Sequence, residues 1–168
     1  MTISWFGLSS FKITGKDITI ITDPFGKSTG LTAVRGAADV VIKAAAPLDF
    51  RPKSIAAQKI KKKKAELSLD LEPTADILKD LGAHKNGRVL VGFAAETENH
   101  LKHGLEKLRA KNLDLIVVNS VGGPDSAFDS DINHATIIDM AGNTEEIPTV
   151  SKHAMADRIL DRVAQLLK

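Results

Sequence analysis

The chain has 168 residues, 43% of them hydrophobic and 26% charged, which is enough for one domain with a substantial core. It contains no cysteine, which excludes disulfides, thiolate nucleophiles and cysteine-ligated metals and favours the cytoplasm. No apolar run approaches the roughly 20 residues that cross a bilayer, and the N-terminus lacks the pattern of a secretion signal. We therefore expect a single domain over residues 1–168, cytoplasmic and without a membrane partner.

The formal net charge of +2 is unevenly distributed along the chain. Residues 51–64 contain many lysines and arginines and no acid, whereas acids outnumber bases elsewhere. Such a run repels itself unless it is solvated or gathered around a polyanion, so it indicates either an exposed flap or an anion site. No aromatic residue within it would stack on bases, and we expect no nucleic-acid partner.

The first part of the chain is predicted to form strands. Residues 3–13 and 18–22 are apolar and β-rich, and the turn sequence at residues 14–17 between them indicates a β-hairpin. Residues 38–42 form a short apolar run, typical of a strand buried on both faces. Leucines that alternate with polar residues then predict a half-buried strand over residues 67–72.

Helical and strand patterns alternate in the remainder of the chain. Thr74, Thr97 and Ser151 precede amphipathic stretches and are predicted N-caps of three helices. The predicted core positions of these helices are Ile77, Leu78 and Leu81, then Leu101, Leu105 and Leu108, then Met155, Ile159, Val163 and Leu166. Buried strands are predicted over residues 88–95 and 113–118, and a closing hairpin over the strands 135–140 and 145–148.

This alternation predicts an α/β fold of three layers, Rossmann-like, with a mostly parallel sheet between helices. An N-terminal β-hairpin and a C-terminal hairpin followed by a helix complete it. Ligands of open α/β sheets bind at the carboxyl ends of the strands. Asp49 follows one such end, and its carboxylate suits the exocyclic amine of a base such as cytosine.

Three short motifs are considered as functional sites, and we expect none of them to be one. Gly26-Lys27-Ser28-Thr29 is similar to the end of a phosphate loop, but Ile21 stands where that loop needs a glycine. His100 and His103 are spaced for a shared metal ion, although the surrounding acids fit a solvated helix surface better, so we expect no metal site. No serine lies in a G-x-S-x-G elbow.

From residue 37 to the C-terminus the chain resembles a known family over about three quarters of its length. The motifs are ADVVIKAAAPLDFRPKS, KIKKKK, LEPTADIL, RVLVGFAAETE, EKLRAKNLDLIVVNSV, AFDSDINHATIID and TEEIPTVSK. In order and spacing they resemble the phosphopantothenoylcysteine synthetase family, also called phosphopantothenate–cysteine ligase, of coenzyme A biosynthesis. That family uses CTP to activate the carboxylate of 4′-phosphopantothenate as an acyl-cytidylate, which cysteine then attacks.

The resemblance implies a role for individual residues. Lys59 matches a catalytic lysine of the flap, and Asp49 matches the aspartate that reads cytosine. The other matched positions are Asp76 and Ile77 at a helix start near the phosphates, Phe93 in the GFAAET strand, and Lys107 with Lys111 as paired lysines of the nucleotide site. Lysines that neutralise a polyphosphate and a carboxylate that selects a base are consistent with this chemistry.

The resemblance also implies partners. The nucleotide would be CTP with Mg²⁺, phosphopantothenate would be the second small molecule, and the chain would form a homodimer. The alternating strand over residues 67–72, together with the flap, is the expected dimer contact, because an unpaired strand edge favours pairing with a second copy.

Residues 1–36 resemble a different family. ISWFGLSSFKITGKDITIITDPFG is similar to the opening hairpin of metallo-β-lactamase-fold hydrolases, with Leu8 where those proteins often carry histidine. The chain has no H-x-H-x-D-H metal motif, so metal-dependent hydrolysis is not expected. We interpret the chain as a chimera joined at residues 38–42.

The chimera lacks the glycine-rich N-terminal strand-turn-helix of the ligase family and its Asn-Arg-Ser-Ser-Gly-Lys-type segment. We therefore expect nucleotide binding with ligation weak or lost. Two alternatives stay open, namely a folded scaffold without a ligand, and a complete CTP-dependent ligase formed with another chain that supplies the missing half.

Overall fold

The computed structural model describes the chain except for residues 27–28, 30, 61–67, 97, 121–130 and 168. Two residues of the phosphate-loop motif, Lys27 and Ser28, and the predicted N-cap Thr97 lie outside the described residues. The chain forms two compact units, one from Met1–Ala45 with Ile77–Lys168 and the other from Ala46–Asp76. Each unit is described by itself below.

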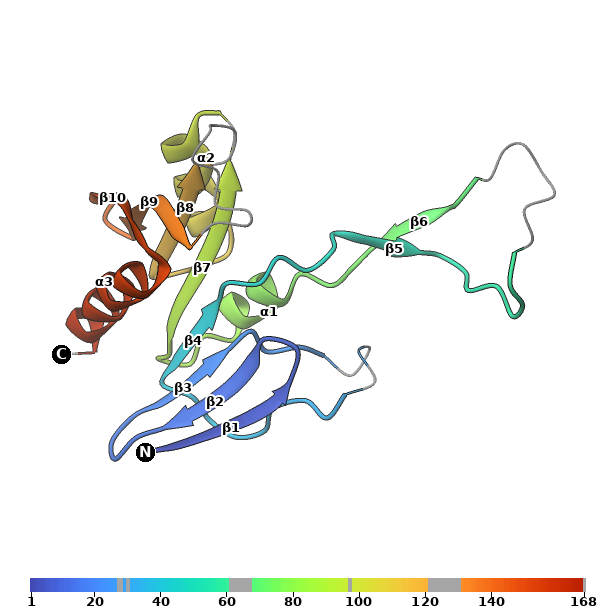
Figure 1. Ribbon diagram of the computed structural model, residues 1–168, viewed down its shortest axis with the longest axis horizontal. Helices are drawn as coiled ribbons and strands as arrows, with labels where there is room; N and C mark the ends of the chain where they lie inside the picture. The colour runs from blue at the N-terminus through green and yellow to red at the C-terminus, as the bar shows by residue number, and fades with distance from the viewer. Residues whose placement is uncertain (27–28, 30, 61–67, 97, 121–130, 168) are drawn as a thin grey trace. The chain divides into compact units, whose positions relative to one another are not determined.

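An eight-stranded sheet runs through the first unit in the order β1-β2-β3-β4-β7-β8-β9-β10 (Figure 1). Its strands are β1 Thr2–Gly7, β2 Ser10–Thr14, β3 Thr19–Thr22, β4 Val40–Lys43, β7 Val89–Glu96, β8 Leu115–Ser120, β9 Ile132–Asp139 and β10 Thr144–Ser151. The four central strands β3, β4, β7 and β8 are parallel, and the strands at both margins pair antiparallel.

Helices cover both faces of this sheet: α1 Ile77–Ala83, α2 His100–Ala110 and α3 Lys152–Leu166. Along β8, Leu115 and Val117 point to one face while Ile116 and Val118 point to the other, and all four are almost free of solvent. One face packs against α3 and the other against α1 and α2. The predicted three-layer, Rossmann-like α/β fold is confirmed.

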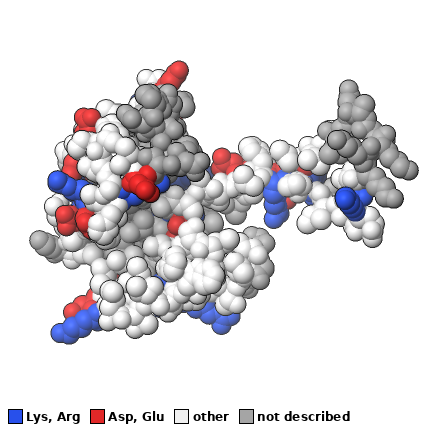
Figure 2. Space-filling model, viewed as in Figure 1, with Lys and Arg blue, Asp and Glu red and all other residues white. Residues whose placement is uncertain are grey.

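The surface of the first unit mixes both signs of charge around its helices (Figure 2). In the part of the chain that is described, no helix is both long and apolar enough to span a bilayer.

The N-terminal strands differ from the predicted hairpin. Residues 3–13, expected to be one strand, form β1 and β2 with a turn between them, so that β3 completes a three-stranded antiparallel meander. The turn arises because Gly7 and Leu8 have φ values of 104° and 51°, a region that interrupts an extended chain. Apolar residues on both sides of the turn concealed it in the sequence.

The helix ends agree only in part with the predicted caps. Ser151 caps α3 as expected, because its Oγ accepts a hydrogen bond from the Ala154 amide at 3.1 Å. Thr74 does not cap α1, since its hydroxyl donates to the Leu48 carbonyl at 2.6 Å. Two predicted core leucines are exposed, Leu101 by 52% and Leu166 by 44%, and both lie in the terminal turn of their helix.

The second unit is a narrow two-stranded arm. β5 Phe50–Pro52 pairs antiparallel with β6 Leu71–Pro73. Of the strand predicted over residues 67–72, residue 67 lies outside the described residues, residues 68–70 are not in a strand, and residues 71–72 belong to β6. The Thr74 amide donates to the Asp49 carbonyl at 2.8 Å and joins the two sides at their base. Residues 46–60 and 68–71 are all exposed, so backbone hydrogen bonds rather than an apolar core hold the arm together.

Candidate functional site

The carboxyl ends of the four parallel strands meet at one edge of the first unit's sheet, which is where open α/β sheets bind ligands. Three polar clusters lie at this edge. They are built on Glu96 at the end of β7, on Asp23 directly after β3 with Lys43 at the end of β4, and on Asn119 in β8.

Glu96 connects β7 to the side chains of α2. Its carboxylate is 13% exposed, accepts a hydrogen bond from Lys107 Nζ at 2.5 Å, and lies 3.5 Å from His103 Nδ1. Burial by itself would raise the pKa of Glu96, but the hydrogen bond and the charges of Lys107 and His103 outweigh it and hold the pKa below its ordinary 4.5. Glu96 is therefore ionised at neutral pH and orients the Lys107 ammonium, which stays 48% exposed.

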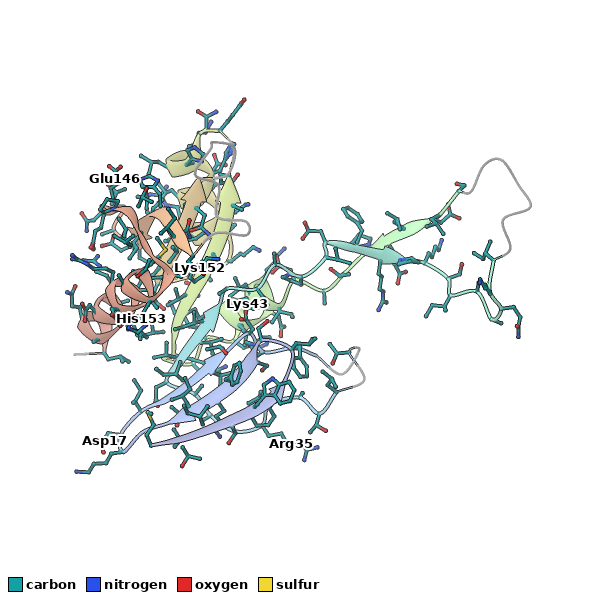
Figure 3. The ribbon with its side chains drawn as sticks, in the orientation of Figure 1. Asp17, Arg35, Lys43, Glu146, Lys152 and His153 are labelled. Atoms are coloured by element: carbon teal, nitrogen blue, oxygen red, sulfur yellow. The ribbon has the colours of Figure 1, made fainter. Side chains whose placement is uncertain are left out.

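Asp23 and Lys43 form a buried ion pair, with side chains 9% and 8% exposed. Lys43 is labelled in Figure 3. Lys43 Nζ donates to Asp23 Oδ1 and to the Ala45 carbonyl, both at 3.2 Å, and the Ala45 amide donates to Asp23 Oδ1 at 2.8 Å. Asp23 has a φ of 43°, which non-glycine residues seldom adopt. The pair thus holds both backbone polar groups of Ala45 just beyond β4.

Asn133 in β9 ties the ends of three elements together. Its Nδ2 donates to Asn119 Oδ1 at 3.1 Å and lies 3.5 Å from Met155 Sδ in α3, and its Oδ1 accepts from the His134 amide at 2.9 Å. Asn133 is 7% exposed, so these partners replace the water it loses on burial. This cluster fixes the start of β9 against the end of β8.

The seven predicted site residues are divided between the two units. Three belong to the arm, namely Asp49, Lys59 and Asp76, and four belong to the first unit, namely Ile77, Phe93, Lys107 and Lys111. Asp49, Lys59 and Asp76 are exposed. The Asp49 backbone is held by Thr74, so its position in the arm is defined while its side chain faces solvent.

Within the first unit the sheet separates the predicted residues. Phe93 packs on the face covered by α3, whereas Lys107 belongs to α2 on the opposite face. Ile77 begins α1, and the Lys111 backbone lies against Gly82 near the end of that helix. The structure therefore brings Lys107 to Glu96 but does not bring Phe93 and Lys107 together on one face.

The two histidines considered for metal binding behave differently from each other. His103 faces Glu96, while the buried Nδ1 of His100 has no hydrogen-bond partner among the described residues. No group of three or more His, Cys, Asp or Glu side chains in the described segments is placed to hold a metal ion.

Residues 29–167 match the family described as DNA/pantothenate metabolism flavoprotein C-terminal domain. The chain belongs to this family. The match begins inside the segment 1–36 that was predicted to have a different ancestry, and it leaves residues 1–28 outside.

The relatives of this flavoprotein C-terminal domain include longer proteins of coenzyme A biosynthesis. The chain is 44% identical over 136 residues to the coenzyme A biosynthesis bifunctional protein CoaBC of Bacillus subtilis, covering 81% of this chain and 34% of that protein. It is 41% identical over 142 residues to CoaBC of Mycolicibacterium smegmatis, covering 78% of this chain and 34% of that protein. The chain thus spans about a third of the length of these relatives.

Solved structures agree with the family assignment. The crystal structure of the C-terminal domain of a CoaBC protein is 36% identical, with a TM-score of 0.61 over 77% of this chain and 55% of that one. The DNA/pantothenate metabolism flavoprotein from Streptococcus pneumoniae is 16% identical, with a TM-score of 0.59 over 78% of this chain and 62% of that one. The second likeness shows the fold alone.

Sequence reasoning passed over the Asp23–Lys43 pair and the Asn119–Asn133 cluster. Two features of the sequence could have indicated the Asp23–Lys43 pair. Asp23 and Pro24 directly follow the apolar strand over residues 18–22, and Lys43 directly follows the apolar run over residues 38–42. Their contact joins positions 20 residues apart, so only the parallel pairing of β3 with β4 brings them together. Glu96 is one of the acids that surround His100 and His103 in the sequence, and no local pattern predicts its contact with Lys107, 11 residues away.

Proposed function

We propose that the chain is the CTP-binding part of a phosphopantothenate–cysteine ligase of coenzyme A biosynthesis, in which ligation is weak or lost. The observation that carries this proposal is the family match over residues 29–167, supported by 44% identity to a bifunctional coenzyme A biosynthesis protein. Phosphopantothenate is the proposed second substrate, and the reducing cytoplasm is the proposed location.

Lys107 is the proposed phosphate contact in the first unit. Its ammonium is anchored by Glu96 and is still half exposed, so it is oriented before a ligand arrives. An ammonium group has three donors, which leaves donors for phosphate oxygens after the bond to Glu96 is made. We assign Lys111, Phe93 and Ile77 to the same nucleotide by their family match.

The arm is proposed to recognise the base. Asp49 presents an exposed carboxylate beside a hydrogen-bonded backbone, which suits the exocyclic amine of cytosine. Lys59 is the proposed catalytic lysine. Mg²⁺ is proposed to enter with CTP, because this ion is commonly held by substrate phosphates with one or two carboxylates, and Asp49 and Asp76 are exposed acids of the arm.

We further propose that the chain is a chimera with an N-terminal hairpin of metallo-β-lactamase type. Residues 1–28 lie outside the family match, and the three strands they form pair antiparallel with one another, although β3 also pairs parallel with β4. The proposed weak or absent ligation rests on residues 1–28, which lie outside the match to the family. We also propose a homodimer through the exposed arm, whose β6 belongs to a two-stranded sheet.

Calorimetric titration with CTP and Mg²⁺, with ATP as the control nucleotide, tests the binding proposal. We expect saturable binding that prefers CTP, and we expect Asp49→Asn and Lys107→Ala each to weaken it more than tenfold, about 1.4 kcal/mol. Lys102→Ala is the matched control, because Lys102 is an exposed lysine of the same helix.

Failure of both nucleotides to bind a folded protein would favour the scaffold alternative. Unchanged affinity in both variants, with CTP still bound, would refute the site assignment. Pyrophosphate release on adding phosphopantothenate, CTP and cysteine tests whether ligation survives, alone or with the missing segment supplied as a second chain.

A further inference from the structure

The two edges of the eight-stranded sheet are built differently. The β10 edge carries Glu145, Glu146 and Pro148 and has a register shift between Ile147 and Val150, all of which discourage another strand from pairing there. The β1 edge has none of these charges or prolines, because residues 1–11 contain no charged side chain and no proline. The register of β1 shifts only after Trp5.

One face of β1 and β2 is apolar and uncovered. The pairs Ile3 with Ile13 and Trp5 with Phe11 place these four side chains on one face. Ile3 is 58% exposed, Trp5 68% and Phe11 37%. On the opposite face of the meander Ile21 is 6% exposed and Ser10 is fully buried, and the exposed side chains of β1 on that face, Thr2 and Ser4, are polar.

The continuation of this face through the sheet shows what is missing. Ile13 pairs with Ile20 of β3, and Ile20 pairs with Val40 of β4, which belongs to the core cluster that α3 completes. The apolar face is therefore one surface along the sheet, covered at one end by a helix of this chain and bare at β1. Figure 2 shows the surface over the N-terminal strands with charged groups only near its margins.

The size of the bare surface fits a protein contact. Met1 is 93% exposed and Leu8 69%, at the two ends of β1. With about 200 Å² for each large side chain, these two residues with Ile3, Trp5 and Phe11 expose on the order of 600 Å², the upper end of the apolar patches on monomers. A standard interface buries about 800 Å² per partner, which the patch reaches when the strand edge is added.

We propose that β1 pairs antiparallel with β1 of a second copy of this chain, about a two-fold axis at Ser4. In this register Ile3 of each copy lies opposite Trp5 of the other, and the two bare faces join into one apolar stripe. A two-fold contact brings like residues together, and the uncharged β1 carries no side-chain charges to repel each other there. The same contact through β10 would bring together Glu145 and Glu146 of both copies.

Single cysteines test this contact directly, because the chain has none of its own. In the proposed register Ser4→Cys places two thiols on directly opposed residues, about 5 Å apart at Cβ, close to the spacing of a disulfide. Thr144→Cys, an exposed position on the β10 edge, is the matched control. We expect mild oxidation to convert Ser4→Cys into a covalent dimer and to leave Thr144→Cys largely uncrosslinked.

Sedimentation of the full chain gives the second measurement. We expect Trp5→Lys to lower the solution mass to that of the assembly formed without the β1 contact, and Leu160→Lys, at a position on α3 that is 43% exposed, to leave it unchanged. Circular dichroism verifies that both variants are folded, and the crosslinking result stands independently if Trp5→Lys is not.

An unchanged mass for folded Trp5→Lys, or equal crosslinking of the two cysteine variants, would overturn the proposal. Neither substitution lies in the arm, so the arm-mediated dimer and the nucleotide site are tested separately from this contact.

Discussion

Two pairs of adjacent strands in the same sheet, β7 with β8 and β1 with β2, have very different surroundings. Leu115 and Val117 of β8 are fully buried, whereas Ile3 and Trp5 of β1 are mostly exposed. The central pair is covered by helices on both faces, and the N-terminal pair has an uncovered apolar face. The difference shows that apolar strand sequence alone does not determine burial, because what packs on the strand decides it.

The same comparison follows the extent of the family match. The central pair lies within the family match at residues 29–167, and the first strand pair lies outside it. The stabilising core therefore comes from the family domain, while the N-terminal segment contributes a strand edge and one half of a buried ion pair.

The largest expected effect is in the centre of the sheet. Leu115→Ala should lower the free energy of unfolding by about 2–5 kcal/mol, because it leaves a cavity between helix-covered faces. Ile3→Ala should cost less than about 1 kcal/mol in the monomer, since Ile3 is 58% exposed. Urea denaturation followed by circular dichroism at low protein concentration measures both, and equal losses would contradict the comparison.

A smaller effect is expected where the two regions meet. Asp23→Asn should lower the free energy of unfolding by about 2–3 kcal/mol, because the Lys43 ammonium would stay buried without its counter-charge. The double variant Asp23→Asn with Lys43→Met should be more stable than Asp23→Asn alone. A double-mutant cycle in urea measures this coupling, and strictly additive losses would show that the pair contributes nothing as a unit.

The smallest expected change in stability concerns the turn between β9 and β10, at the β10 edge of the sheet. Burial alone would raise the pKa of Asp139, but hydrogen bonds from Asn143 and the Ala141 amide, with the charge of Arg162, outweigh it and hold the pKa below its ordinary 3.8. Because the pKa of Asp139 is lower in the folded state than in the unfolded state, its ionised carboxylate stabilises the fold at pH values above the unfolded-state pKa, near 3.9. This stabilisation is lost as the pH falls through the folded-state pKa.

Asp139→Asn should therefore cost about 1 kcal/mol at pH 7 and progressively less below pH about 4. Asp157→Asn is the control, since Asp157 is 65% exposed on α3. Thermal unfolding of the three proteins between acid and neutral pH gives the comparison. A difference between Asp139→Asn and the parent chain that does not change with pH would rule out this cause.

Elements with local signals could be predicted from the sequence, and those with distant partners could not. The apolar run of β8 and the Ser151 cap were foreseen because their determinants lie within a few residues. Thr74 was misjudged as a cap because its partner, the Leu48 carbonyl, is 26 residues away. The turn at Leu8 was missed because no charged or proline residue marks it.

The candidate site was predictable only in part for the same reason. Lys107 was singled out by resemblance, but its partner Glu96 is 11 residues away and faces it only after β7 and α2 have packed together. The alternation along β7 would have placed Phe93 and Glu96 on opposite faces, and the structure bears out that separation. The functional roles of these residues stay predictions.

The buried contact between Asp23 and Lys43 also matters to anyone who wishes to shorten this protein. A chain cut at residue 29, where the family match begins, would keep Lys43 and discard its carboxylate partner. It would also strip β3 from the side of β4 and leave that strand as a new open edge. Such a fragment would be prone to aggregate, even though every residue of the recognised family domain would be present.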